Sequence, residues 1–80
     1  MMPRTVFEEL IGPINGVNTT FSTSEPYESG RTRVWRNGVL QMSEPAYVDG
    51  WDEVPPTTIV MREAPLTGDA LQIHYYPATP

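Results

Sequence analysis

The sequence predicts an all-β protein, an antiparallel β-sandwich of about six to seven short strands joined by hairpin turns. Glycine and proline together make up 15 of the 80 residues, and both residue types favour turns. The turn signals divide the chain into segments of about 5 to 8 residues, which is the length of ordinary strands. Most of these segments alternate apolar and polar side chains, as strands with one buried face do.

The first segment does not follow this alternation. Phe7, Leu10 and Ile11 recur at helical spacing, with two glutamates between the first two of them. Either one helical turn or an extended arm fits this pattern. We therefore divide the chain into an N-terminal arm, residues 1–11, and a single β-sandwich domain, residues 12–80. The arm has two readings, which are a contact with neighbouring proteins and an edge strand of its own sandwich.

Turn signals follow the arm at short intervals. They are Gly12-Pro13, Asn15-Gly16, Glu25-Pro26, Ser29-Gly30, Asn37-Gly38, Asp49-Gly50, Pro55-Pro56 and Thr67-Gly68-Asp69. The strongest of them is Asn37-Gly38, because it lies directly between two strand-like runs and both residues tolerate a positive φ. It predicts a hairpin closed by a type I′ turn.

Between the turns, alternating runs predict strands at residues 17–23, 31–36, 39–42, 57–62 and 70–76. The apolar phase of these runs defines the expected core. Its members are Phe21, Val34, Ile59, Met61, Leu71, Ile73 and Tyr75. In the last run Gln72, His74 and Tyr76 fall on the opposite, polar side.

Composition limits the chemistry and the partners of the chain. There is no cysteine, only one histidine and a formal charge of −5, with no lysine at all. Disulfides and thiolate or multi-histidine metal sites are excluded, and we expect no cofactor and no metal ion. An acidic chain does not favour nucleic acid or anionic membrane surfaces, since both require surplus basic residues. We also expect no export through a cleaved leader, because glutamates follow early in the chain.

No pattern of catalytic residues emerges, so we do not expect an enzyme. His74 has no second titratable group at a spacing that suggests acid–base chemistry, and it is interpreted as a surface or interface residue. Asp49, Asp52 and Glu53 contain part of the ligand set of a calcium loop but lack its other oxygen ligands. We interpret these three acidic residues as a solvated loop.

Four pieces of the chain in this order resemble a known module: INGVNTTFST at residues 14–23, RVWRNGV at 33–39, TIVM at 58–61, and APLTGD at 64–69 with IHYY at 73–76. The resemblance is to a small, immunoglobulin-like all-β module of tailed-bacteriophage virion proteins, and it covers residues 12–77. Arg36 departs from the pattern, because an apolar strand residue is usual there.

The resemblance implies a non-enzymatic structural protein of a bacteriophage particle. It implies a small multicopy subunit bound to the capsid or to the neck or tail, in a decoration or accessory assembly role. Its location would be the virion, assembled in the host cytoplasm. Its partners would be other virion proteins, and copies of itself are a further option. The resemblance carries over no catalytic residue.

The residues assigned to partner binding lie in two places. Phe7, Leu10 and Ile11 belong to the arm, and Arg31, Arg33 and Trp35 share one face of a predicted strand. Arginine and tryptophan are enriched at binding hot spots. The competing structural reading is that these side chains only cover the outer face of the sheet.

The alternative function is a carbohydrate-binding or host-adhesion module of a phage fibre or spike. In that case aromatic rings would stack on sugar rings. The candidate rings are Trp35, Tyr47, Trp51 and Tyr76.

Overall fold

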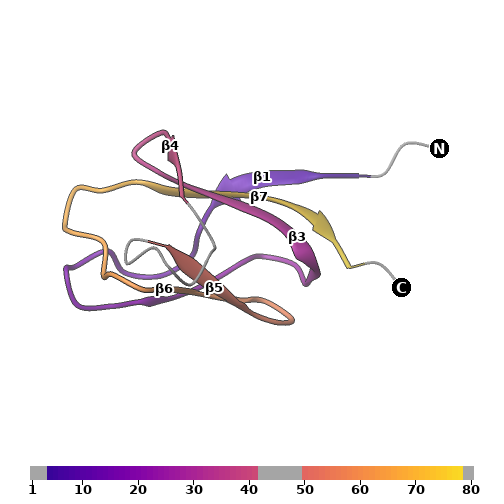
Figure 1. The fold of residues 1–80 in the computed structure, drawn as a ribbon, viewed down its shortest axis with the longest axis horizontal. Helices are drawn as coiled ribbons and strands as arrows, with labels where there is room; N and C mark the ends of the chain where they lie inside the picture. The colour runs from indigo at the N-terminus through magenta and orange to yellow at the C-terminus, as the bar shows by residue number, and fades with distance from the viewer. Residues whose placement is uncertain (1–3, 42–49, 79–80) are drawn as a thin grey trace.

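The computed structural model describes residues 4–41 and 50–78, and all regular structure in them is β. Two antiparallel sheets pack face to face, as Figure 1 shows, so the predicted sandwich class is confirmed. The strand order is β1-β7-β3-β4 in one sheet and β2-β6-β5 in the other. The strands are β1 (Val6–Glu9), β2 (Thr20–Ser22), β3 (Tyr27–Arg36), β4 (Val39–Leu40), β5 (Trp51–Val54), β6 (Thr58–Met61) and β7 (Leu71–Pro77). Within the described ranges no helix is long and apolar enough to cross a membrane.

The core lies between the two sheets and is built from the apolar phase of the strands. All seven predicted core residues are buried, with exposed fractions of 2% or less, so this prediction is confirmed. Leu10, Tyr27 and Trp51 complete the buried cluster. Burial of an apolar side chain of this size stabilises the fold by roughly 1.5 to 3 kcal/mol.

The Asn37-Gly38 hairpin is also confirmed. Arg36 of β3 pairs with Val39 of β4, which leaves a two-residue loop between the strands. Asn37 has a φ of 53° and Gly38 a φ of 81°. Two positive φ values in a two-residue loop are the signature of the type I′ turn, whose twist matches that of the flanking strands.

The turn expected at Ser29-Gly30 is wrong, because β3 runs through both residues. The register between β3 and β7 shifts between Tyr27 and Thr32, which marks a β-bulge, and Gly30 has a φ of 81°. The Glu53 carboxylate accepts the Gly30 N–H at 2.8 and 3.1 Å and also the Thr32 hydroxyl. Glycine is favoured in bulges as well as in turns, since both can require a positive φ. Glu53, which holds this bulge, lies on β5 of the other sheet.

β3 begins at Tyr27, earlier than the predicted run 31–36, and two further parts of the chain differ from the sequence pattern. The run 17–23 becomes a strand only at Thr20, because Asn15 accepts hydrogen bonds from the backbone N–H groups of Val17 and Asn18 and holds a turn there. Val17 is consequently 82% exposed instead of facing the core. Asp52 and Glu53 are expected in a solvated loop, yet they lie in β5, which pairs with β6 from Trp51 to Val54.

The N-terminal segment is an edge strand. β1 pairs with β7 through four residues, Val6 to Glu9, and the next residue, Leu10, is 6% exposed in the core. Glu8 points inward, where its carboxylate accepts bonds from the Tyr75 hydroxyl at 2.8 Å and the Ser24 hydroxyl at 2.7 Å. Of the two readings of residues 1–11, the edge strand is therefore the one found, and residues 6–10 belong to the sandwich.

Arg36 occupies an inward-facing position without being left unpaired. Its guanidinium lies 2.8 Å from an Asp69 carboxylate oxygen and 3.5 Å from Glu63. Asp69 also accepts the backbone N–H of Leu66 and the side-chain amide of Asn37. The pKa of Asp69 is held below its ordinary value by the hydrogen bond from Asn37, by the one from the Leu66 N–H and by Arg36. One carboxylate thus connects the β3–β4 turn to the 64–69 corner.

Candidate binding surface

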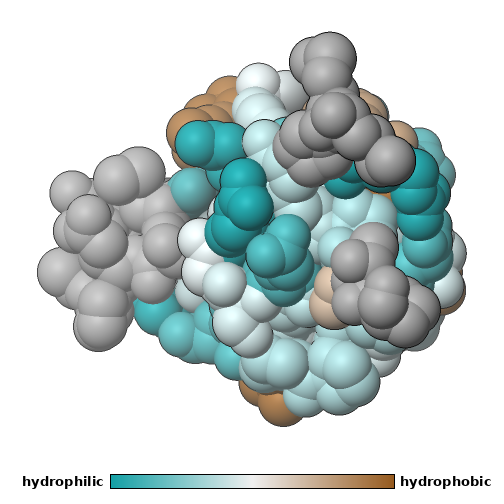
Figure 2. Space-filling model, turned by 90° about the vertical axis from the view of Figure 1, so that its right-hand side faces the viewer, coloured by the Kyte–Doolittle hydropathy of each residue, from teal (hydrophilic) through white to brown (hydrophobic). Residues whose placement is uncertain are grey.

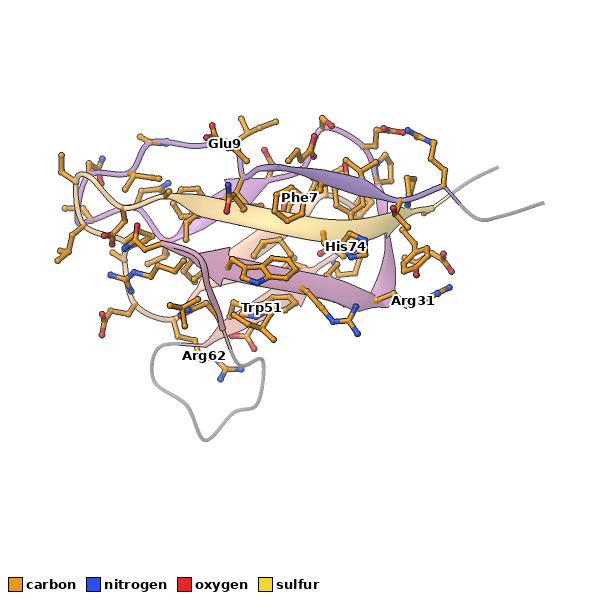
Figure 3. The ribbon with its side chains drawn as sticks, turned by 90° about the horizontal axis from the view of Figure 1, so that it is seen from above. Phe7, Glu9, Arg31, Trp51, Arg62 and His74 are labelled. Atoms are coloured by element: carbon orange, nitrogen blue, oxygen red, sulfur yellow. The ribbon has the colours of Figure 1, made fainter. Side chains whose placement is uncertain are left out.

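The four-stranded sheet has a solvent-facing side, opposite to the core, which we call the outer sheet face. The register of β1, β7, β3 and β4 decides which side chains share it. Figure 3 looks onto this side, with Phe7, Glu9, His74 and Arg31 on the strands nearest the viewer. Its residues are Phe7, Glu9, Arg31, Arg33, Trp35, Leu40, Gln72, His74 and Tyr76.

One half of the outer sheet face is apolar. Trp35 lies directly across from Leu40, and its ring centroid is 5.5 Å from that of Phe7 on the far side of β7. Phe7 is 59% and Leu40 47% exposed, while Trp35 is half-buried. Three large apolar side chains from three different strands therefore meet in contact with solvent. An apolar surface that links several elements is typical of a binding site.

The other half of the outer sheet face is cationic. The Arg31 guanidinium lies 3.8 Å from the centre of the Tyr76 ring and 3.6 Å from the Glu28 carboxylate. Beside it is a hollow of about 220 Å³, lined by Gly30, Arg31, Thr32, Arg33 and Tyr76. The end of the molecule that carries both termini is mostly hydrophilic, with strongly apolar residues at its margin (Figure 2).

The six residues assigned to partner binding divide between this surface and the rest of the fold. Phe7, Arg31, Arg33 and Trp35 come together on the outer sheet face. Leu10 does not, since it is buried in the core. Ile11 is 53% exposed, but its backbone pairs with Ser22 of β2, which belongs to the other sheet.

Sequence reasoning did not assign Leu40 to the surface. The signal was available, because a two-residue turn at Asn37-Gly38 places residue 35 opposite residue 40 and on the same face. Glu9, two residues beyond Phe7, follows by the same alternation once residues 6–9 are known to form a strand.

The four aromatic rings proposed to bind sugars do not form one platform. Trp51 is 4% exposed and lies in the core, and its indole N–H has no partner among the described residues. Tyr47 lies outside the described residues. Trp35 and Tyr76 do share the outer sheet face, but Arg31 covers the Tyr76 ring.

Two of the three acidic residues expected in a loop, Asp52 and Glu53, are engaged with the fold. Asp52 forms an ion pair with Arg62 at 2.6 Å, and the hydrogen bond from Arg62 holds the pKa of Asp52 below its ordinary value. Glu53 is occupied by the β3 bulge, and Asp49 lies outside the described residues. Across the described ranges, no three acidic or histidine side chains are grouped as metal ligands.

Among the described residues, Glu8, Ser24 and Tyr75 form a cluster of polar groups that could be compared with a catalytic site. Burial raises the pKa of Glu8, but hydrogen bonds from Ser24 and Tyr75 outweigh it and leave that pKa below its ordinary value. Burial is also the largest cause of the raised pKa of Tyr75. A carboxylate with a lowered pKa is a poor general base, and a phenol with a raised pKa stays neutral. The hydrogen bonds of the cluster link Glu8 of β1 to Tyr75 of β7 and to Ser24.

His74 lies between Phe7 and Arg33 on the outer sheet face, where its ring contacts Tyr76 edge-on at 5.8 Å. Neither cross-strand neighbour is a carboxylate that could orient the imidazole for acid–base work. His74 thus lies on the outward side of β7, where the alternation of the last run placed it.

Comparison with known proteins identified no relative of this chain. No protein-family model matches the chain, and neither the curated proteins nor the solved structures include a significant match.

Proposed function

We propose that this protein is a non-enzymatic structural subunit of a bacteriophage particle, which docks on another protein of the capsid, neck or tail through its outer sheet face. The virion setting rests on the sequence resemblance. The observation that carries the docking role is the exposed surface on which Phe7, Trp35 and Leu40 adjoin Arg31 and Arg33.

The composition of this surface suits protein binding. Aromatic residues and arginine are enriched in the centres of interfaces, where they combine large apolar area with directed hydrogen-bond donors. The central strands β7 and β3 carry Tyr76, Arg33 and Trp35, and a ladder of paired residues fixes their spacing. Because the backbone of these strands is already paired in a sheet, little backbone conformational entropy is lost when a partner binds.

The sheet edges are poorly suited to the same task. β1 has two glutamates among four residues, β4 has two residues and β2 has three. β5 carries two acidic residues out of four. Short or charged edge strands resist pairing with another chain. The partner is therefore expected to cover a face and to leave the edges uncovered.

The small size of the chain fits a subunit that gains stability from its assembly. A domain of this length buries only about 60% of its extended-chain surface and is marginally stable alone. A partner that binds the native state alone adds RT ln(1 + [L]/Kd), so the local concentration in a particle raises stability.

Carbohydrate binding is the second candidate, favoured by the two aromatic rings, Trp35 and Tyr76, on one exposed sheet face. Sugar stacking requires an uncovered ring face. Arg31 already lies over Tyr76, and Trp35 packs against Phe7. The geometry therefore supports protein docking better than sugar stacking.

The test is incorporation into particles. Particles purified from cells that carry the gene are analysed by mass spectrometry, comparing the wild-type chain with an Arg33→Ala, Trp35→Ala double variant. Val54→Ala is the matched control, since Val54 is 48% exposed on β5 of the other sheet.

We expect the wild-type and control chains in the particles and strong depletion of the double variant, with all three folded by circular dichroism. Absence of the wild-type chain from particles, or incorporation of the double variant at normal copy number, would contradict the proposal. Binding of the wild-type chain on a glycan array, lost in the double variant, would favour the second candidate.

A further inference from the structure

The five arginines of the chain differ in their partners. Four of them form ion pairs with the chain's own carboxylates: Arg4 with Glu25, Arg31 with Glu28, Arg36 with Asp69 and Glu63, and Arg62 with Asp52. For Arg33, no ion pair or hydrogen bond links its side chain to any residue in ranges 4–41 and 50–78. The chain has ten carboxylates for five arginines, so acidic partners are abundant. An exposed, unpaired arginine on a central strand is thus unusual for this molecule.

Arg33 also borders the hollow on the outer sheet face. The lining of this hollow contains two arginines and no carboxylate. Gly30 is part of this lining, and a Cβ built there would meet no atom within 4 Å. The bulge that requires a positive φ at Gly30 therefore also keeps this position free of a side chain. Tyr76 and Thr32 supply the rest of the wall.

The second arginine is already held in place. Arg31 is stacked on Tyr76 and paired with Glu28, so its charge is fixed at one side of the hollow. Arg33 retains all five N–H donors, and a guanidinium binds a carboxylate through two parallel hydrogen bonds. The apolar side chains of Phe7 and Trp35 lie on the same face, next to His74 and Gln72.

We propose that this hollow binds an aspartate or glutamate side chain of the docking partner, with the Arg33 guanidinium as the main donor and apolar neighbours of that acidic residue packing on Phe7 and Trp35. This inference rests on the docking role proposed above and specifies the chemistry of the partner. Two arginines in a chain of charge −5 favour a single carboxylate over a polyanion such as nucleic acid, because phosphate-backbone binding requires many cations.

The experiment is a titration of the ¹⁵N-labelled full chain, followed by the amide signal of Gly30 and the side-chain Nε–H signal of Arg33. The probe is a capped hexapeptide of alternating glutamate and leucine. The matched probe has glutamine in place of glutamate. We expect saturable shifts of both signals with the first probe, at least tenfold weaker binding of the second, and weakening with added salt.

Three variants keep the test specific to the hollow. Arg33→Gln should weaken binding at least tenfold, and Arg33→Lys should weaken it less because it keeps the charge but loses the paired donors. Arg62→Gln, at the residue that follows β6 of the other sheet, should leave binding unchanged. Equal binding by wild-type chain and Arg33→Gln would overturn the proposal.

Other occupants are distinguished in the same experiment. Inorganic phosphate or a short single-stranded oligonucleotide that shifts the Arg33 signal more strongly than the glutamate peptide would overturn the carboxylate assignment. Shifts that grow with the concentration of the chain alone would identify a second copy as the occupant and would also overturn it.

The two proposals can fail separately. If particles lose Arg33→Gln but the peptide does not bind, docking stands and the carboxylate assignment is wrong. If the peptide binds but particles lack the wild-type chain, the hollow stands and the virion role is wrong.

Discussion

The close approach of Gly12 to the core gives a prediction that tests the packing of the sandwich. Gly12 has a φ of 150°, and a Cβ built on it would lie 2.8 Å from Cδ1 of Phe21 and 3.2 Å from the carbonyl oxygen of Thr20. Phe21 is 1% exposed, so its ring cannot turn into solvent without opening the core. The substitution Gly12→Ala therefore combines backbone strain with overpacking.

The expected loss of stability is the sum of the backbone strain and the overpacking. A φ that essentially only glycine adopts costs on the order of 1 to 3 kcal/mol, and forcing an extra carbon into a packed core costs about 1 to 3 kcal/mol. We expect Gly12→Ala to lower the free energy of unfolding by roughly 2 to 6 kcal/mol. The free energy of unfolding of an 80-residue domain is roughly 4 to 12 kcal/mol in total. The variant should therefore retain little stability.

The matched control is Gly38→Ala in the β3–β4 turn. Gly38 also has a positive φ, 81°, but a Cβ there would meet no atom within 4 Å. Only the left-handed penalty of about 1 to 2 kcal/mol applies. The loss at Gly12 should therefore exceed the loss at Gly38.

The assay is urea and thermal unfolding, followed by the fluorescence of the two tryptophans, Trp35 and the buried Trp51. A change of 1 kcal/mol in the free energy of unfolding corresponds to about 4 to 8 °C in Tm for a domain of this size. In a Phe21→Leu background the cost of Gly12→Ala should shrink, because the contacted ring is absent, and a double-mutant cycle measures that coupling. Equal losses for Gly12→Ala and Gly38→Ala, or full additivity with Phe21→Leu, would refute the proposed clash.

Three further predictions concern the core, the N-terminal strand and pH. Phe21→Ala should cost roughly 3 to 5 kcal/mol and leave most of the domain unfolded at 37 °C, whereas a Tm within a few degrees of wild type would show that the strand phase is misassigned. Deletion of residues 1–10 removes β1 and the buried Leu10, so the loss in unfolding free energy should be roughly 3 kcal/mol or more; an unchanged urea midpoint would mean that the segment is not part of the sandwich. Glu8 has a lowered pKa in the folded state, so its stabilising effect is complete above its ordinary pKa of 4.5 and is lost as the pH falls below that value. Glu8→Gln should accordingly flatten the loss of stability between neutral pH and pH 3, as measured by urea unfolding at several pH values, and parallel pH curves for the two proteins would refute this linkage.

The fold class, the core and the central hairpin could be predicted from the sequence alone. These features depend on local rules. Period-two alternation assigns Ile59, Met61 and Ile73 to one face irrespective of the partner strand, and Asn37-Gly38 favours one turn type through its own φ preferences. The grouping of Arg31, Arg33 and Trp35 followed from the same alternation within a single strand.

The features that depend on a second strand could not be predicted in this way and are visible only in the folded protein. The sequence pattern assigned Ser29-Gly30 to a turn, but Gly30 lies in a bulge of β3. Its backbone N–H donates a hydrogen bond to Glu53, which is 23 residues away in the sequence. Pairing with β7 makes residues 6–9 a strand against their helical spacing, since backbone hydrogen bonds and the burial of Leu10 outweigh local preference. The hollow beside Arg33 also depends on two strands. Tyr76 of β7 lines it together with residues 30–33 of β3, next to the bulge that shifts the register between these strands. The register of the β3–β4 hairpin follows from its two-residue turn. The pairing of β7 with β1 and β3, and the bulge in β3, join segments far apart in the sequence, so no local pattern encodes them.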